Sequence, residues 1–225
     1  MARSTGIRNR VHLAATLGVL GILAFAPGII PAARAADDSP KTAAEAMAFF
    51  EGQVDEWLDG PAEYIILDEE RDIWRTLTTT AEREDFIDWF WTRRDNDLRV
   101  DGNPYKEAFY ARVAEANDRF PDFPRGWRSD RGRVFVTLGR PDSMRGIFEH
   151  GFSGTVWTYY TDARERGFVS PIGEVTVLFA QEGTLYEIAG GYGGRGSYPF
   201  YLLRAFEYAN EAAIADAALE LVPPA

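Results

Sequence analysis

Residues 125–133 read Arg-Gly-Trp-Arg-Ser-Asp-Arg-Gly-Arg, and they stand where the hydrophobic period of the chain changes from helical to alternating. We call this stretch the tryptophan bend. Gly126 permits a backbone turn that other residues resist, and Trp127 supplies a large apolar anchor. Ser129 and Asp130 can accept hydrogen bonds from backbone N–H groups and so hold the turn. The tryptophan bend is therefore predicted to clamp a set of helices onto a set of strands.

The end of the tryptophan bend carries residues that can fix its neighbours. Arg131 can pair with a carboxylate, and Asp130 and Asp95 are the candidates. Gly132 would let a following strand approach the helices closely, because it has no side chain.

Four amphipathic helices are predicted before the tryptophan bend from apolar residues at helical spacing. Ser39 and Pro40 form the N-cap and first turn of the first helix. Thr79 and Glu82 form a capping box for the third, and Asn103-Pro104 begins the fourth. The predicted spans are 39–60, 68–77, 79–91 and 103–120.

Four short strands are predicted after it, because apolar and polar residues then alternate. Their predicted spans are 134–138, 155–160, 174–180 and 185–188. A glycine-rich connection over 190–197 and a closing helix over 202–217 complete the chain. Helices followed by strands predict an α+β fold, in which N-terminal helices pack on a small, mainly antiparallel four-stranded sheet with a C-terminal helix.

The N-terminus has the features of a signal peptide. Arg3, Arg8 and Arg10 precede an uncharged run over 13–33, and Ala33-Arg34-Ala35 offers the small-x-small pattern of a cleavage site. An uncleaved membrane anchor is the competing interpretation, but prolines within the run break its helix. The mature chain is expected to begin at Ala36, to be periplasmic or extracellular, and to have no membrane contact after cleavage.

The signal peptide is the first of four predicted segments. Residues 1–35 are the signal peptide and 36–62 a helical lead-in. Residues 63–190 are expected to form the α+β domain, and 191–225 the glycine-rich connection with the C-terminal helix.

Charge and cysteine content exclude several classes of partner and site. The chain has 35 acidic and 24 basic residues, a net charge of −11. Because the leader carries arginines and no acid, the mature chain is more negative still, which argues against nucleic acid and anionic membranes. No cysteine is present, so stability must come from burial rather than disulfides.

Catalytic side chains are scarce. His150 is the one histidine outside the leader, and it lies in a predicted loop, where a solvated histidine is the simpler interpretation. No zinc-binding spacing occurs, and the glycine-rich stretch lacks the lysine of a phosphate-binding loop. The acidic groups around Asp95 and Asp101 resemble fragments of a calcium loop but fit a turn better. No catalytic residue, metal or cofactor is predicted.

The tryptophan bend also resembles a known sequence signature. Gly126-Trp127-Arg128-Ser129-Asp130 is similar to the Gly-Trp-x-Thr-Asp motif of the GWxTD domain, a module of exported bacterial proteins with no assigned biochemical role. The resemblance continues in order through Glu82-Arg83, Phe90-Trp91 and Arg94-Asp95 upstream, and through Gly139-Arg140-Pro141-Asp142 downstream. It covers about 64–188.

Departures from the motif are few. Ser129 replaces the usual threonine and keeps its hydroxyl, whereas Asn96-Asp97 replaces a proline-bearing stretch and Pro104-Tyr105 replaces Glu-Phe. The change after Asp95 weakens any role that depends on the geometry of that loop.

These observations favour a non-catalytic binding or assembly module of the cell envelope. An envelope or secreted protein partner is expected to dock on a sheet or groove near Trp127, Tyr159 and Tyr160, because exposed aromatic residues contribute strongly to interfaces. The oligomeric state is left open. The residues expected to form the binding or structural motif are Gly126, Trp127, Ser129, Asp130, Arg131, Gly132, Arg94 and Asp95.

Two other functions remain open. An envelope-polymer hydrolase could use Asp130 or Asp95 as acid or base, with Arg131 and Arg133 holding an anion. A stable accessory part of an exported pathway, with no ligand of its own, is the third possibility.

Overall fold

The computed structural model describes residues 39–120, 125–160, 174–190 and 198–215. The chain divides into Met1–Asp37 and one compact unit, Asp38–Ala225, and the description below concerns the second. The predicted signal peptide and almost all of the predicted glycine-rich connection lie outside the described residues. Among the described residues, no helix is both long and apolar enough to cross a membrane.

Helices occupy the first half of the compact unit, as predicted. They are α1 (Ala43–Glu51), the 3-10 turns η1 (Val54–Asp59) and η2 (Pro61–Tyr64), and the helices α2 (Asp68–Thr76), α3 (Thr80–Thr92) and α4 (Pro104–Arg119). The first predicted helix was wrong at both ends. Thr42 rather than Ser39 caps α1, in a capping box with Glu45, and the helix gives way after Glu51 to a 3-10 turn.

The other start signals are confirmed in atomic detail. The Thr79 hydroxyl accepts a hydrogen bond from the Glu82 N–H at 3.2 Å, and the Glu82 carboxylate accepts one from the Thr79 N–H at 2.8 Å. Asn103 Oδ1 accepts a hydrogen bond from the Lys106 N–H at 2.9 Å. Each cap gives the free N–H groups of a first turn a partner, which is why these helices begin where they do.

An aromatic core joins these helices. Trp57 of η1 lies 4.9 Å from the ring of Phe90 in α3 and 5.6 Å from that of Trp74 in α2, measured between centroids. Trp91 continues the cluster to Tyr110 in α4 at 5.4 Å. Aromatic side chains bury large areas, so the core substitutes for the missing disulfides.

The first predicted strand is a helix. Residues 134–138 form the end of α5 (Asp130–Leu138), which follows the 3-10 turn η3 (Gly126–Arg128). All five residues are buried, and a short apolar run that is buried all round does not distinguish a helix from a strand. The caps do: Ser129 caps the N-terminus of α5, and Gly139 ends the helix with φ +78°.

The four-stranded antiparallel sheet is confirmed, with a different first strand. It contains β1 (Ser143–Glu149), β2 (Phe152–Tyr159), β3 (Val175–Glu182) and β4 (Leu185–Ile188), in the order β1-β2-β3-β4. β1 escaped prediction because its residues are almost all exposed and so show no alternation. His150 and Gly151, both at positive φ, form the tight turn between β1 and β2.

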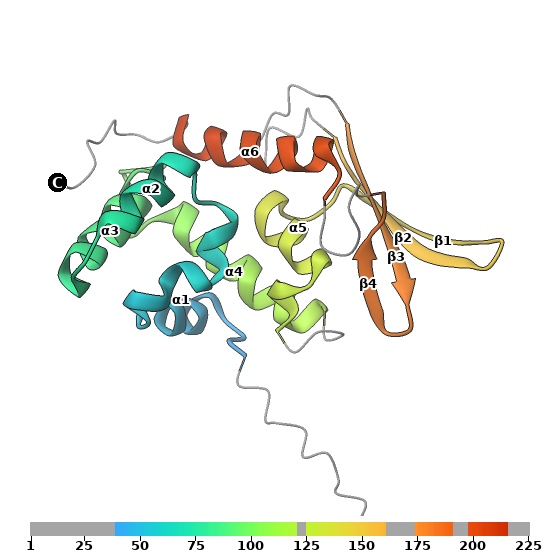
Figure 1. Cartoon of the computed structure of the whole chain (residues 1–225), viewed down its shortest axis with the longest axis horizontal. Coiled ribbons are helices and arrows are strands. Elements are labelled where there is room, and N and C mark those ends of the chain that lie inside the picture. Colours follow the sequence, from blue (N-terminus) through green and yellow to red (C-terminus); the bar gives the residue numbers. More distant parts are fainter. Residues whose placement is uncertain (1–38, 121–124, 161–173, 191–197, 216–225) are drawn as a thin grey trace, which may run out of the picture. The chain divides into compact units, whose positions relative to one another are not determined.

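Helices cover one face of this sheet. Trp157 pairs with Val177, and Thr155 with Phe179, so these side chains share a face, on which Trp157, Val177 and Phe179 are buried. α5 lies between α4 and the sheet (Figure 1), and the closing helix α6 (Phe200–Ala215) packs on α5 and β3. The predicted α+β fold is therefore confirmed. The β1–β2 hairpin extends beyond the helices.

Candidate functional site

The tryptophan bend is in close contact with α4 at Gly126. A Cβ atom at Gly126 would lie 2.1 Å from the carbonyl oxygen of Ala116 and 2.8 Å from Cα of Asn117. Both are backbone atoms that no rotamer change can move. Gly126 is thus required for close approach to a helix, rather than for the unusual turn angle expected from the sequence.

Trp127 is buried among the N-terminal helices, with 2% of its surface exposed. Its ring packs edge-on against Phe50 of α1 and tilted against Tyr64 of η2, both at 5.6 Å between centroids. The Asn117 side chain accepts a hydrogen bond from its N–H, and the Tyr64 hydroxyl donates one to its carbonyl oxygen, each at 3.4 Å. Trp127 therefore holds α1, η2 and α4 together.

Ser129 closes the tryptophan bend on itself. Its hydroxyl donates a hydrogen bond to the Gly126 carbonyl at 2.7 Å and accepts one from the Gly132 N–H at 2.9 Å. A Cβ atom at Gly132 would lie 2.0 Å from the same Gly126 carbonyl. Gly132 was expected to admit a strand; it instead lets the first turn of α5 close over the bend.

Replacing Ser129 with alanine is expected to lower the free energy of unfolding by about 1–2 kcal/mol, because the buried Gly132 N–H loses its partner and the Gly126 carbonyl keeps only the Ser129 N–H at 3.1 Å. Ser129→Thr introduces the threonine of the motif that the bend resembles and keeps the hydroxyl, so it should retain most of the stability. Urea unfolding of both variants measures the difference. Equal loss in the two would contradict the stabilising role given to the hydroxyl.

Asp130 connects the bend to the sheet and to Tyr198, which precedes the C-terminal helix α6. Its Oδ2 accepts a hydrogen bond from the Ile188 N–H of β4 at 2.7 Å, and its Oδ1 accepts one from the Tyr198 hydroxyl at 3.1 Å. Burial raises the pKa of Tyr198 to about 12, so the phenol keeps its proton and remains a donor at neutral pH. Trp127 thus joins the helices to one another, whereas Asp130 makes the hydrogen bond that connects the bend to the sheet.

Two arginines of α5 lie on aromatic rings. The Arg131 guanidinium carbon is 3.8 Å from the ring centroid of Tyr186 in β4, and that of Arg133 is 4.9 Å from Tyr64 and 4.7 Å from Tyr198. Cations are attracted to the faces of such rings. These contacts tie α5 to the sheet and to η2; pairing of Arg131 with a carboxylate stays a prediction.

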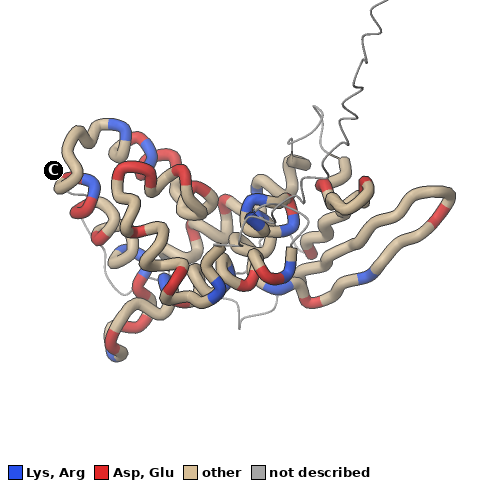
Figure 2. Tube along the Cα trace, turned by 90° about the horizontal axis from the view of Figure 1, so that it is seen from below, with Lys and Arg blue, Asp and Glu red and all other residues tan. Residues whose placement is uncertain are grey.

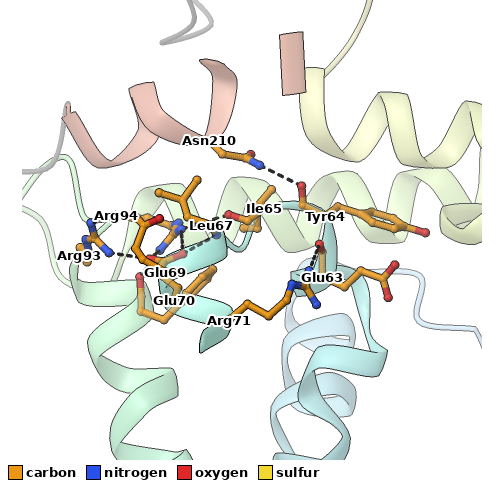
Figure 3. Close-up of polar contacts among 11 residues, drawn as sticks. Glu63, Tyr64, Ile65, Leu67, Glu69, Glu70, Arg71, Arg93, Arg94 and Asn210 are labelled. Carbon is orange, nitrogen blue, oxygen red and sulfur yellow. Dashed lines mark hydrogen bonds and ion pairs between the residues drawn. The ribbon is translucent and has the colours of Figure 1, made fainter. Parts of the chain in front are cut away.

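Arg94 belongs to a second polar cluster, centred on a carboxylate of α2 (Figure 3). Arg94 and Glu70 are both fully buried and form a bidentate ion pair with N···O distances of 2.8 and 2.7 Å. The same guanidinium donates to the carbonyl oxygens of Phe90 and Ile65 at 3.0 and 3.1 Å. Glu70 also accepts from the Leu67 N–H at 2.9 Å. This cluster locks the start of α2 to the end of α3.

Asp95 has a local role. Its Oδ1 accepts a hydrogen bond from the Asp97 N–H at 3.1 Å, and Asp95 is 9% exposed. This hydrogen bond forms the turn expected between α3 and α4. Asp95 thus bonds within the connection between α3 and α4, whereas Asp130 bonds to β4 and to Tyr198.

The aromatic docking surface expected near Trp127, Tyr159 and Tyr160 is not formed. Trp127 and Tyr159 are each 2% exposed, and only Tyr160 reaches the surface. The Tyr159 hydroxyl donates a hydrogen bond to the Gly139 carbonyl at 3.1 Å, so this ring packs beneath the end of α5. The expectation was wrong because large aromatic residues pack in a protein core as readily as they form an interface, and the sequence does not distinguish the two.

The uncovered apolar side chains lie elsewhere. Met144 and Phe148 of β1 are 59% and 83% exposed. Phe200, Tyr201 and Leu203 at the start of α6 are also exposed. Figure 2 shows that charges are sparse along the β1–β2 hairpin, where Arg145 and Glu149 are the charged side chains of the two strands.

Residues able to hold a metal ion do not gather in the described ranges, where no group of three histidine, aspartate or glutamate side chains has suitable geometry. A groove of about 630 Å³ runs along α1, and none of the motif residues lines it. The chemistry available at the tryptophan bend is hydrogen bonding and cation–ring contact within the chain.

Several residues of these clusters were missed in the sequence. No partner was assigned from the sequence to Glu70, Tyr64, Asn117 or Tyr198. The spacing of Glu70 and Arg94 carries no periodic signal, because Glu70 lies in α2 and Arg94 follows the end of α3.

The sequence profile of the GWxTD domain matches residues 37–171 of the chain. No curated protein and no solved structure matches the chain significantly.

Proposed function

This chain belongs to the GWxTD domain family, and from that premise we propose that it is an exported, non-catalytic module of the cell envelope that binds another polypeptide. The family name describes a sequence signature and carries no activity. The function must therefore be argued from what the signature residues do and from the surface they leave uncovered.

The signature residues support a structural role. Trp127 and Ser129 are buried, and the hydroxyl of Ser129 is engaged on both sides. Both oxygens of Asp130 accept hydrogen bonds from this chain. A residue whose polar atoms are occupied within its own chain has little left for a ligand.

The observation that carries the proposal is the exposed apolar face of β1. We call Met144, Gly146 and Phe148 the hairpin surface. They lie on one face of the strand, and Phe148 is 83% exposed. Exposed large apolar residues with few charges around them mark interaction sites, so the hairpin surface is a place where a partner would gain by binding.

The leader supports the location. Basic residues, an uncharged run over 13–33 and a small-x-small site are what secretion requires. The cysteine-free composition suits an oxidising compartment, because no thiol can form a wrong disulfide there.

The polymer hydrolase finds less support in the geometry. An acid or base must be free to exchange a proton with its substrate. Asp130 is bound to Ile188 and Tyr198, and Asp95 to the Asp97 N–H.

The test is photo-cross-linking in the producing cell. A benzoylphenylalanine at position 148 is expected to give a covalent adduct with a polypeptide, whereas the same probe at the exposed position Glu84 of α3 should give none. The mass of the chain in the same sample reports whether it begins at Ala36. Equal labelling at 148 and 84 would reject the hairpin surface as a binding site.

A further inference from the structure

β1 is an open edge of the sheet. The strand order is β1-β2-β3-β4, so within the described residues β1 has a neighbour on one side only. The opposite edge is partly covered: β4 packs against α5, and its outward Ile188 N–H donates to Asp130. An exposed edge is a template for another strand, and of the two described edges β1 is the more exposed.

The register of the hairpin shows which backbone groups face outward. Glu149 pairs with Phe152 across the two-residue turn, and the closing pair of such a turn is hydrogen-bonded. By alternation Ile147 and Arg145 also bond toward β2, and the Arg145 carbonyl indeed accepts from Thr155 Oγ1 at 3.4 Å. The outward N–H and C=O groups therefore belong to Met144, Gly146 and Phe148.

The side chains of the same three residues continue the core face of the sheet. Met144 pairs with Trp157, which is buried under the helices. At β1 this face extends beyond the helices (Figure 1), so Met144 and Phe148 are exposed. In the described chain, the residues with outward N–H and C=O groups are thus the same residues whose apolar face is exposed.

β1 is complementary to itself. Gly146 is its midpoint, with Met144 and Phe148 two residues away on either side. Antiparallel pairing of two β1 strands about Gly146 overlaps all seven residues and places Met144 opposite Phe148 of the second copy, twice. The two glycines meet at the centre, where no side chain separates the strands.

The charges neither favour nor forbid this register. Arg145 faces Ile147 of the second copy, and its two diagonal neighbours there are Glu149, of opposite charge, and Arg145, of like charge. No charge lies directly opposite a like charge. Methionine sulfur against an aromatic ring is a favourable contact.

We propose that the polypeptide bound by the hairpin surface is a second copy of this chain, paired β1 to β1 into one continuous sheet. The inference rests on the proposed function, because it names the partner of the same surface. A partner of unrelated sequence would have no reason to match the midpoint of β1, whereas a two-fold axis at Gly146 satisfies every outward group of the strand.

Engineered cysteines test the register, because the natural chain has none. Met144→Cys and Phe148→Cys place thiols on exposed positions. Mixed and oxidised, the two variants should form a disulfide-linked dimer, because directly opposed residues lie about 5.5 Å apart between Cα atoms. Either variant alone should not, since its own cysteines would be about 13 Å apart along the strands. In sedimentation, Phe148→Asp should stay monomeric where the natural chain is dimeric.

The outcomes separate this inference from the proposed function. A mixture that links no better than the single variants overturns pairing about Gly146. If the probe at position 148 then captures a different protein, the binding function stands and only the second copy is rejected. If the probe captures nothing, both are rejected.

Discussion

Replacing Arg94 with methionine is expected to lower the free energy of unfolding by about 3 kcal/mol, because the buried Glu70 carboxylate loses its bidentate partner and keeps only the ion pair with Arg93 at 3.0 Å. Glu70 is fully buried and cannot turn to water. The loss should appear as a lower urea midpoint, together with loss of the contacts that fix the end of α3. A loss of this size could prevent folding altogether in a domain of ordinary stability.

A second variant keeps this expectation testable. Replacing Arg94 and Glu70 together by methionine and leucine removes both charges, and it should recover much of the lost stability, because apolar residues replace buried ion pairs well. Arg75→Met is the matched control. Arg75 and Asp72 also lie 2.9 Å apart, but both side chains are about 70% exposed, so the control should change stability little. Similar losses in Arg94→Met and Arg75→Met would contradict a special role for the buried pair.

Replacing Gly132 with alanine is the second large effect, and its sign opposes helix propensity. Alanine normally stabilises a helix relative to glycine by about 1 kcal/mol. Here its Cβ would lie 2.0 Å from the Gly126 carbonyl oxygen and 2.7 Å from Cα of Trp127. The overlap involves backbone on both sides, so the bend must open, and the expected destabilisation is about 3 kcal/mol or more.

Gly146→Ala serves as the control, measured by thermal unfolding in dilute solution. A Cβ atom at Gly146 meets nothing within 4 Å, and the residue does not have positive φ. Alanine there should be neutral or slightly stabilising. If Gly132→Ala were as mild as Gly146→Ala, the close packing of the bend against α5 would be wrong.

Local signals were sufficient for most of the helices. The capping box of Thr79 and Glu82 and the cap at Asn103 could be predicted because each depends on residues three apart in sequence. The same kind of signal was present for α5, in Ser129 and Gly139. The alternating pattern of 134–138 outweighed it, and that pattern has no meaning where every side chain is buried.

Long-range partners explain what the sequence did not show of the candidate site. The motif residues were identified, but the partners of Asp130 lie 58 and 68 residues further along the chain. Glu70 and Arg94 meet across two helices for the same reason. The hairpin surface was missed because β1 faces solvent on both sides and lacks the burial that produces periodicity.

The hydrogen bonds of Asp130 show that the folding unit is longer than the region that matches the family. The family match ends at residue 171, whereas Ile188 and Tyr198, the strands β3 and β4, and the helix α6 all follow it. A polypeptide emerging N-terminus first therefore presents its signature long before the groups that complete it exist. Until those groups are made, the Asp130 carboxylate lacks its two hydrogen-bond donors. Truncation at residue 171 would remove β3 and β4, which are half of the sheet.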